Sequence, residues 1–297
     1  MHVQTDPQIT AEFEELRPYL FRVAYSHLGS RGEADDVVQE AWLRLVRTDR
    51  SEIRNLRAWL TTVVSRLAVD ALTSARARRE EYVGPWLPEP LVHTRSPKED
   101  PAGRAELDES VSMALLIVLE SLSPAERSAF LMHDVFGYTF EEVAGMLGRS
   151  PAATRQLASR ARHAVEARRP RYPAAPEEQE RVVEAFRSAS ESGDLEALLE
   201  LLDPSVTFRS DGGGVVSAAR RTFTGSDRVA RIFTGMARHF GERYGFKPIA
   251  VNGAAGLVLD MGREPSVISF VVDAGRITEI DVVRNPEKLT GLPSLGG

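Results

Sequence analysis

The sequence predicts a multidomain protein in which two all-α domains are followed by an α+β domain. Apolar residues recur at three- and four-residue steps between residues 10 and 83 and again between 106 and 169, which is the period of amphipathic helices. A proline-rich stretch separates these two helical parts. After residue 176, two helical stretches give way to β-rich runs, an order typical of an α+β domain. We therefore predict domains at residues 1–84, 106–170 and 171–297, with a linker at 85–105.

Three helices are expected in the first domain. Apolar residues mark one face of the first helix, and two glycines end it: Phe13, Leu16, Leu20, Val23, Gly29 and Gly32. The second helix begins near Glu33, and its acidic first turn suits the positive end of a helix dipole. The third helix runs from Leu56 to about Arg79.

The linker is acidic and contains Pro85, Pro88, Pro90 and Pro97, a composition that disfavours regular structure. It nevertheless includes the sequence WLPEP at residues 86–90. A large aromatic side chain is costly to leave in water, so we expect Trp86 to dock on a folded domain.

The second helical domain carries two helix-start signals and a glycine turn. Ser123 with Glu126, and Thr139 with Glu142, have the spacing of capping boxes. The stretch TFEEVAGMLG ends at Gly148, and a further helix begins at Ser150-Pro151. Two short helices joined in this way form a helix-turn-helix pattern. Its second helix is expected to expose Thr154, Arg155, Ser159 and Arg162, with Gln156 and Arg160 near the edge.

The last domain should begin with two helical stretches, VVEAFRSASESG and DLEALLELL. The runs VTF, VISFVV and ITEIDVV then predict strands, with a helix at about residues 227–240 among them. We expect a curved antiparallel sheet covered by helices.

Composition excludes several classes of protein. The 297 residues include no cysteine, which excludes disulfides, Cys-ligated metals and Cys nucleophiles. The six histidines show no metal-binding spacing, so no metal or cofactor is expected. The first residues lack the pattern of a signal peptide, and no apolar run is long enough for a membrane helix. We predict a cytoplasmic protein without membrane contact.

The net charge of −6 hides strong local differences. Between residues 47 and 79, eight arginines oppose three acidic residues, and between 145 and 172, seven oppose one. Between residues 85 and 126, eight acidic residues oppose three basic ones. A nucleic-acid footprint is a local basic face, so an acidic chain can still bind DNA.

Two stretches resemble the bacterial sigma factors. ADDVVQEAWLRL at residues 34–45 is similar to the helix of sigma region 2, and residues 55–79 follow it as the promoter-facing part does. The stretch at residues 122–165 resembles sigma region 4. The two regions are joined by a short linker alone, which resembles the extracytoplasmic-function (ECF) type. The resemblance covers roughly the first 170 residues.

The tail resembles a SnoaL-like domain, a small α+β cone of the nuclear-transport-factor-2 type. WLPEP in the linker, DGGG at residues 211–214 and NPEKL at residues 285–289 are similar to the signatures of ECF sigma factors with a SnoaL-like extension. NPEKL departs mildly from the expected NPDKL.

The resemblance implies the roles of particular residues. Core RNA polymerase would bind Asp35, Asp36, Gln39 and Glu40, although the first two could equally serve the helix N-terminus. The −10 promoter element would contact Asn55, Arg66, Asp70 and Arg76. The −35 element would contact Arg149, Thr154, Arg155, Gln156, Ser159, Arg160 and Arg162, most of the arginines at phosphates. Interdomain regulation would involve Trp86, Leu87, Pro88, Asp211, Gly212, Gly213, Gly214, Asn285, Pro286, Glu287, Lys288 and Leu289.

The implied function is promoter-specific transcription initiation with core RNA polymerase, controlled in cis by the tail and without a dedicated anti-sigma protein. The alternative is a helix-turn-helix regulator with a ligand-sensing tail. The resemblance leaves open whether a small molecule binds in the cone. Catalysis is not expected, although Asp211, Asp281 and His239 are the side chains that an enzyme could use.

Overall fold

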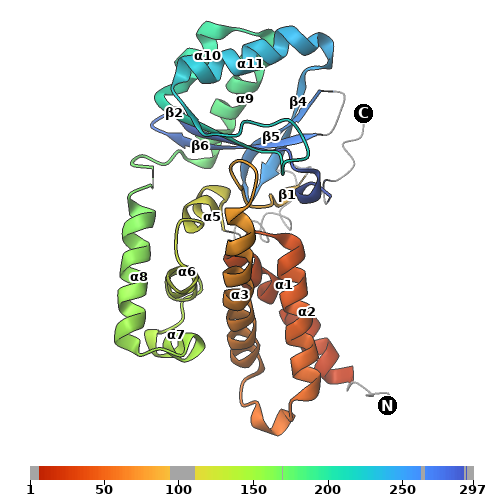
Figure 1. The fold of residues 1–297 in the computed structure, drawn as a ribbon, viewed down its shortest axis with the longest axis vertical. Helices are drawn as coiled ribbons and strands as arrows, with labels where there is room; N and C mark the ends of the chain where they lie inside the picture. Colours follow the sequence, from red (N-terminus) through yellow and green to blue (C-terminus); the bar gives the residue numbers. More distant parts are fainter. Residues whose placement is uncertain (1–6, 94–110, 169, 262–264, 291, 293–297) are drawn as a thin grey trace. The chain divides into compact units, whose positions relative to one another are not determined.

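The computed structural model describes residues 7–93, 111–168, 170–261, 265–290 and 292 (Figure 1). The chain forms two compact units. The helical unit comprises residues 1–80 and 118–168, and the α+β unit comprises residues 81–117 and 169–297. The described residues 81–93, which follow α3, therefore belong to the same unit as the C-terminal domain.

The helical unit contains the three expected N-terminal helices and the helix-turn-helix. Its elements are α1 (Pro7–Leu28), α2 (Arg31–Arg47), η1 (Arg50–Glu52), α3 (Leu56–Glu80), α6 (Pro124–Phe130), the π-helical turn η2 (Leu131–Val135), α7 (Phe140–Leu147) and α8 (Pro151–Glu166). Helix α5 (Met113–Leu119) spans the point where the chain enters this unit.

Local signals place the ends of these helices. Both predicted capping boxes form, with Ser123 and Thr139 accepting the amides of Glu126 and Glu142. Gly148 ends α7 in the left-handed conformation that a residue with a side chain rarely adopts. The turn between α7 and α8 is therefore set by its own sequence.

The α+β unit has helices α9 (Pro176–Ser192), α10 (Leu195–Leu201) and α11 (Ser226–Phe240) beside one sheet. Its strands are β1 (Val92–His93), β2 (Leu202–Asp211), β3 (Phe223–Thr224), β4 (Gly245–Val251), β5 (Ala254–Asp260), β6 (Ser266–Asp273) and β7 (Arg276–Val283), with the short turns η3 (Gly241–Arg243) and η4 (Pro286–Lys288). The strand order is β1-β4-β5-β6-β7-β2-β3.

The prediction of an antiparallel sheet is wrong at one pairing. Strands β2 and β7 run parallel, whereas the other pairs are antiparallel. A parallel pair needs a long crossover, and α11 with the β4–β6 meander supplies it.

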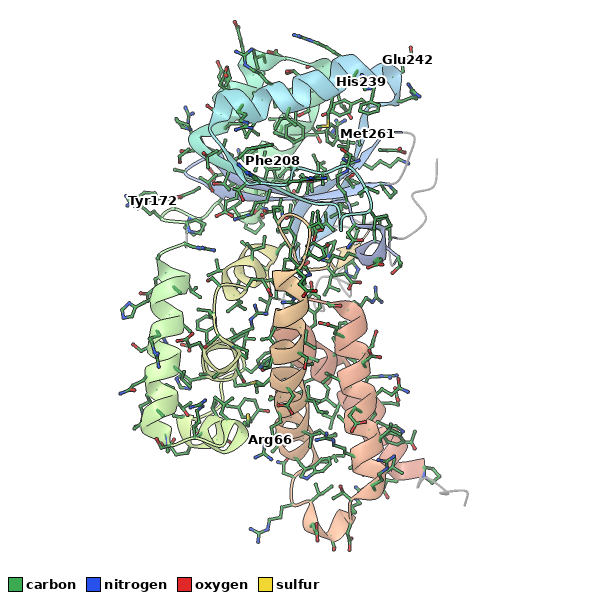
Figure 2. All side chains as sticks on the ribbon, viewed as in Figure 1. Arg66, Tyr172, Phe208, His239, Glu242 and Met261 are labelled. Carbon is green, nitrogen blue, oxygen red and sulfur yellow. The ribbon has the colours of Figure 1, made fainter. Side chains whose placement is uncertain are left out.

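The core of the α+β unit lies between the helices and one face of the sheet. Phe186 packs edge-on against Phe233 and Phe270, with ring centroids 4.8 and 5.1 Å apart, and Phe208 of β2 joins them. Figure 2 shows Phe208 on the side of the sheet that carries α11. Because side chains alternate along a strand, Arg209 and its odd-numbered neighbours in β2 point to the opposite face.

Candidate nucleic-acid interface and motif cluster

The predicted polymerase-binding residues form an exposed row on α2. Asp35, Asp36 and Gln39 are exposed, and the Glu40 carboxylate pairs with Arg44 at 3.0 Å. Leu43 lies one turn further along and is 40% exposed. The row therefore combines acidic groups with an apolar side chain that faces water.

The predicted −10 residues on α3 differ in their surroundings. Asn55, Arg66 and Asp70 are exposed, and the Asn55 side chain caps the start of α3 by accepting the amide of Ala58 at 3.0 Å. Figure 2 shows Arg66 beside α7. Arg66 Nε donates to the carbonyl of Met146 at 3.0 Å and its Nη2 to that of Gly145 at 2.8 Å. The side chain of Arg76 lies outside the described residues.

Among the predicted −35 residues, Arg155 and Ser159 are exposed on α8 as expected, Arg162 is partly exposed, and Arg149, Gln156 and Arg160 are exposed too. Arg155 Nη2 pairs with Glu141 at 3.1 Å, and Arg162 Nε with Asp134 at 2.6 Å. Glu141 lies in α7 and Asp134 in η2, so these pairs orient the two arginines of α8 toward neighbouring elements.

The prediction that Thr154 is exposed is wrong. Its exposed fraction is 0%, because it shares the inner face of α8 with Leu157, Ala158 and Ala161. Its hydroxyl donates to the carbonyl of Ser150 at 3.0 Å, which satisfies the buried oxygen. Thr154 therefore packs the helix-turn-helix and does not face DNA.

A buried polar network joins the two helical parts, and sequence reasoning missed it. His27 Nδ1 donates to the carbonyl of Val23 at 2.7 Å, so its Nε2, 3.1 Å from Ser128 Oγ, accepts that hydroxyl proton. Burial lowers the pKa of His27 to about 4, and the imidazole is neutral. Nearby, the Arg127 guanidinium donates to the carbonyl of His27 at 2.6 Å.

Glu120 is the ionic centre of the same network. Its carboxylate pairs with Arg127 at 2.6 Å and with Arg79 of α3 at 2.5 Å. Arg79 also donates to the carbonyl of Leu28 at 2.7 Å. Arg127 is buried and Glu120 and Arg79 are partly buried, so the network favours this arrangement of the two helical parts and must be broken for them to separate.

Aromatic hydroxyls make a second contact between these parts. Tyr138 donates to Thr61 Oγ1 at 3.1 Å and lies 2.9 Å from the hydroxyl of Tyr19. Burial raises the pKa of Tyr138 to about 12, so the phenol stays protonated.

The three signatures WLPEP, DGGG and NPEKL meet around the Asp211 carboxylate in the α+β unit, and we call Asp211 and its hydrogen-bond donors the motif cluster. Asp211 has an exposed fraction of 0% and accepts four hydrogen bonds. The donors are Tyr82 Oη at 2.6 Å, Leu87 N at 2.9 Å, Gly213 N at 3.0 Å and Lys288 Nζ at 2.7 Å. DGGG, WLPEP and NPEKL thus each contribute a partner.

Lys288 ties the cluster to the aromatic side chains of the segment that follows α3. Its ammonium lies 4.0 Å from the Trp86 ring centroid and 5.1 Å from that of Tyr82, and it donates to the carbonyl of Leu87 at 2.5 Å. Asn285 Nδ2 donates to Tyr82 Oη at 2.9 Å. Burial and the neighbouring Asp211 raise the pKa of Tyr82, which keeps its donor proton.

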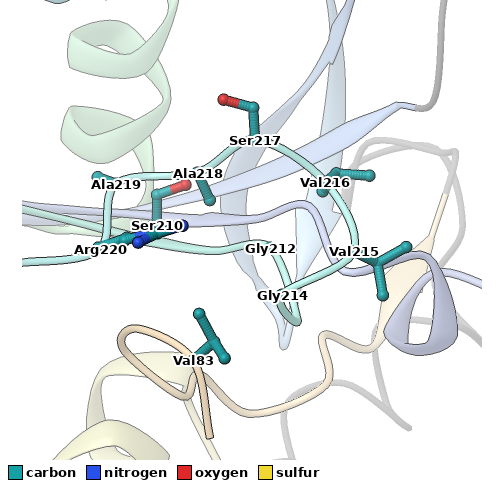
Figure 3. Close-up of a pocket in the computed structure, with 10 residues that line it drawn as sticks. All are labelled: Val83, Ser210, Gly212, Gly214, Val215, Val216, Ser217, Ala218, Ala219 and Arg220. Atoms are coloured by element: carbon teal, nitrogen blue, oxygen red, sulfur yellow. The ribbon is translucent and has the colours of Figure 1, made fainter.

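The glycines of DGGG are required by close approach as well as by conformation. A Cβ on Gly212 would collide with the carbonyl of Val216. Gly213 has φ +65°, and a Cβ there would lie 2.5 Å from Asn285 Cγ. Gly214 has φ +73° and faces Val83, beside which the loop of residues 212–220 arches (Figure 3). No other residue type fits this turn without displacement.

Asn252 holds the same segment at two further points. It adopts a left-handed φ of 47°, and its side-chain oxygen accepts the amide of Leu91 at 3.0 Å. Its Nδ2 donates to the carbonyl of Val111 at 3.0 Å, while β1 pairs with β4. We call residues 81–112 the connector; its described parts are held on the α+β unit near both ends.

The side chains considered for catalysis do not meet in the core of the α+β unit. Asp281 pairs with Arg209 at 2.5 Å on the sheet face opposite the core, and Asp211 binds the connector. His239 is exposed near the end of α11 (Figure 2). Within the described ranges, no helix is long and apolar enough to span a membrane, and no group of acidic or histidine side chains could hold a metal ion.

Comparisons with known proteins agree with this arrangement. The sigma-70 region 2 family matches residues 13–78, and the sigma-70 region 4 family matches residues 112–165. The ECF RNA polymerase sigma factor SigJ of Mycobacterium tuberculosis is 42% identical over 294 residues, covering 95% of this chain and 94% of SigJ. The probable ECF sigma factor SigI of the same species is 36% identical, covering 99% of each chain.

A solved structure supports the same assignment. The crystal structure of Mycobacterium tuberculosis SigJ superposes with a TM-score of 0.77 at 38% identity, covering 96% of this chain and 99% of that one. The expected fold class, helical regions 2 and 4 followed by an α+β cone, is confirmed. The chain therefore belongs to the ECF RNA polymerase sigma factors, in the group with a SnoaL-like C-terminal extension.

Proposed function

We propose that this sigma factor binds core polymerase through α2, the −10 element through α3 and the −35 element through α8, and that the α+β unit controls it in cis. Membership of the family makes core RNA polymerase and promoter DNA its partners and transcription initiation, rather than catalysis by the chain, its function. What we propose is which helices bind these partners and that the α+β unit controls initiation.

The exposed row on α2 suits a basic partner with an apolar patch. Asp36 and Gln39 offer oxygen acceptors one helical turn apart, and Leu43 adds apolar area next to them. An acidic row of this kind also repels DNA, which directs the nucleic acid to the basic helices α3 and α8.

On α8, the exposed arginines suit phosphates and base edges. Arg155 and Gln156 lie near the N-terminal end of the helix, the part that enters the major groove in helix-turn-helix proteins. Arg149 and Arg160 are positioned for phosphates, whose contacts give affinity without sequence preference.

We infer from the contacts of Arg66 that the structure is a closed state, in which region 4 packs on region 2. This −10 candidate is exposed, but its Nε and Nη2 donate hydrogen bonds to carbonyls of α7, so these donors must leave α7 before they can bind DNA. The −10 and −35 elements are separated by about 25 base pairs, or roughly 85 Å of B-DNA. Regions 2 and 4 must therefore part before both elements can be bound.

The connector is where the α+β unit acts on this equilibrium. Tyr82 and Leu87 bind Asp211, and Leu91 and Val111 bind Asn252, so the chain between the two regions is held at both ends. A connector held in this way cannot extend. The protein would then have a closed state with the connector held and an open state with the connector released and regions 2 and 4 apart. Any change that weakens the motif cluster would raise the population of the open state.

The absence of native cysteine allows a direct test with an engineered disulfide. A Cβ on Gly214 would lie 3.3 Å from Val83 Cβ, close to the spacing of a disulfide. The double variant Val83→Cys/Gly214→Cys would lock the start of the connector when oxidised and release it when reduced. Transcription from promoter fragments with core polymerase is the assay.

The control is Gly193→Cys/Ala237→Cys, whose Cβ atoms would be 3.8 Å apart within the α+β unit and away from the connector. Gly193 has φ +69°, so both pairs place one cysteine at a strained glycine position. We expect oxidation to lower initiation by the first variant at least about tenfold, or about 1.4 kcal/mol, and to leave the control unchanged. Equal initiation by the oxidised and reduced first variant would overturn cis control.

We also propose that no dedicated anti-sigma protein is needed, because the motif cluster holds the connector and so inhibits initiation from within the chain. Affinity capture of the full chain from its native cells would test this. Recovery of a stoichiometric partner that blocks initiation would contradict the proposal, whereas recovery of core polymerase alone would support it.

A further inference from the structure

We propose that the core of the α+β unit contains a binding site for a small apolar carboxylic acid. The proposal concerns binding alone and stands whether or not the connector controls initiation. It rests on a cavity of about 270 Å³ bounded by α11, the sheet and the loop of residues 212–220.

The body of the cavity is apolar. Aromatic, aliphatic and thioether side chains line it, among them Phe208, Ile232, Phe233, Met236, Leu259 and Met261. Figure 2 shows Phe208 and Met261 on the α11 side of the sheet. Cavities lined in this way hold water poorly and bind apolar molecules instead. The methionines can also adjust their shape to an occupant.

The polar side chains of the cavity are two serines and one arginine. Ser210, Ser217 and Arg284 also line it, and none of the lining residues is Asp, Glu or His. Arg284 Nε donates to Ser266 Oγ at 3.2 Å, and its Nη1 donates to the carbonyl of Ser217. The guanidinium is thus held in place beside the cavity, as a preformed anion site requires.

This lining selects the class of ligand. A carboxylate would gain charge-assisted hydrogen bonds from the guanidinium and accept from the serine hydroxyls, while its apolar part filled the cavity. A cationic ligand would be repelled by the positive charge of Arg284. A reaction that needs a general base would find none among the lining residues, so the site is suited to binding and not to turnover.

The volume limits the size of the ligand. At roughly 30 Å³ for each water-sized group, the cavity holds about nine or ten non-hydrogen atoms. A straight-chain acid of about eight carbons, or an aromatic acid of similar size, meets that limit. Octanoate is therefore a suitable probe, and 1-octanol is its uncharged counterpart of nearly equal length.

Calorimetric titration of the full chain with the two probes tests the proposal. Octanoate should bind with a dissociation constant on the order of 0.1 mM, as expected for about ten non-hydrogen atoms. Octanol should bind at least about tenfold more weakly. Arg284→Met should remove this preference, and Arg231→Met should not, because Arg231 is an exposed partner of Asp227 on the outside of α11.

A second variant covers the case in which Arg284→Met fails to fold. Ala219 lines the cavity from the loop and is partly exposed, so Ala219→Phe should fill the space without disturbing the core, and octanoate binding should be lost. Three results would overturn the proposal: no octanoate binding at roughly millimolar concentration, equal binding of octanol, or binding that Ala219→Phe leaves unchanged.

Discussion

The ion pair between Lys288 and Asp211 should contribute more to the stability of the motif cluster than any other contact in it. Lys288→Met keeps the length of the side chain but removes the one cation among the four donors to Asp211. The carboxylate then stays buried with three neutral donors. Breaking a buried pair by removing one partner costs about 3–5 kcal/mol, and the remaining hydrogen bonds should keep the loss near 3 kcal/mol.

A double-mutant cycle separates the ion pair from the packing of the lysine stem. Asp211→Asn alone removes the negative charge and turns an amide donor toward groups that donate, so it should be destabilising as well. If the pair is the support, the double variant should lose less than the two single variants together, with a coupling free energy of about 1.5–3 kcal/mol.

Urea unfolding followed by circular dichroism measures these free energies, and the transition that contains the α+β unit is the relevant one. Arg231→Met serves as the control, since its exposed pair with Asp227 should make no measurable difference. Additivity of the Asp211 and Lys288 variants within about 0.5 kcal/mol would refute the reasoning, because the two charges would then act independently.

Three further predictions follow from single sites. As the pH falls below 6.5, the unfolded chain protonates His27, whereas the folded protein excludes that proton until about pH 4, so the free energy of unfolding should fall by up to about 3 kcal/mol across this window. Urea midpoints against pH should show a shallower slope for His27→Asn, and parallel curves would contradict the assignment. Arg155→Ala should weaken promoter binding by holoenzyme about tenfold or more, whereas buried Thr154→Val should leave it unchanged; gel-shift titrations decide between them. Gly213→Ala should cost at least about 2 kcal/mol more than Gly137→Ala, because both glycines have positive φ but only Gly213 would place a Cβ against Asn285; equal losses in thermal unfolding would show that the contact is unimportant.

Elements with local signals could be predicted from the sequence. The caps at Ser123 and Thr139 and the left-handed Gly148 depend on residues within a few positions of each other, and the structure has them where the sequence predicts. Thr154 was misassigned because a polar side chain was taken as a sign of exposure. Its position three residues before Leu157 puts it on the inner face, where its hydroxyl bonds to its own helix.

Features that depend on long-range pairing could not be predicted in the same way. His27 and Ser128 are 101 positions apart, and no local pattern marks either as a partner. The parallel pairing of β2 with β7 likewise joins strands that the α11 crossover separates. Asn252 and Gly253 form the two-residue turn between β4 and β5, which Asn-Gly favours locally, but the bonds from the Asn252 side chain to Leu91 and Val111 depend on distant parts of the chain.

The alternation of side chains along β2 links the two proposals. Ser210 lines the cavity of the α+β unit, and the next residue, Asp211, binds the connector from the opposite face of the sheet. The loop that follows also lines both that cavity and a second one of about 350 Å³ beside Val83 (Figure 3). A ligand in the first cavity would therefore touch the loop whose glycines fit against Asn285 and Val83. If octanoate binds, the oxidised and reduced forms of the Val83→Cys/Gly214→Cys variant should differ in their affinity for it, because a coupling between two sites is reciprocal. Equal affinities would mean that the cavity and the connector are independent.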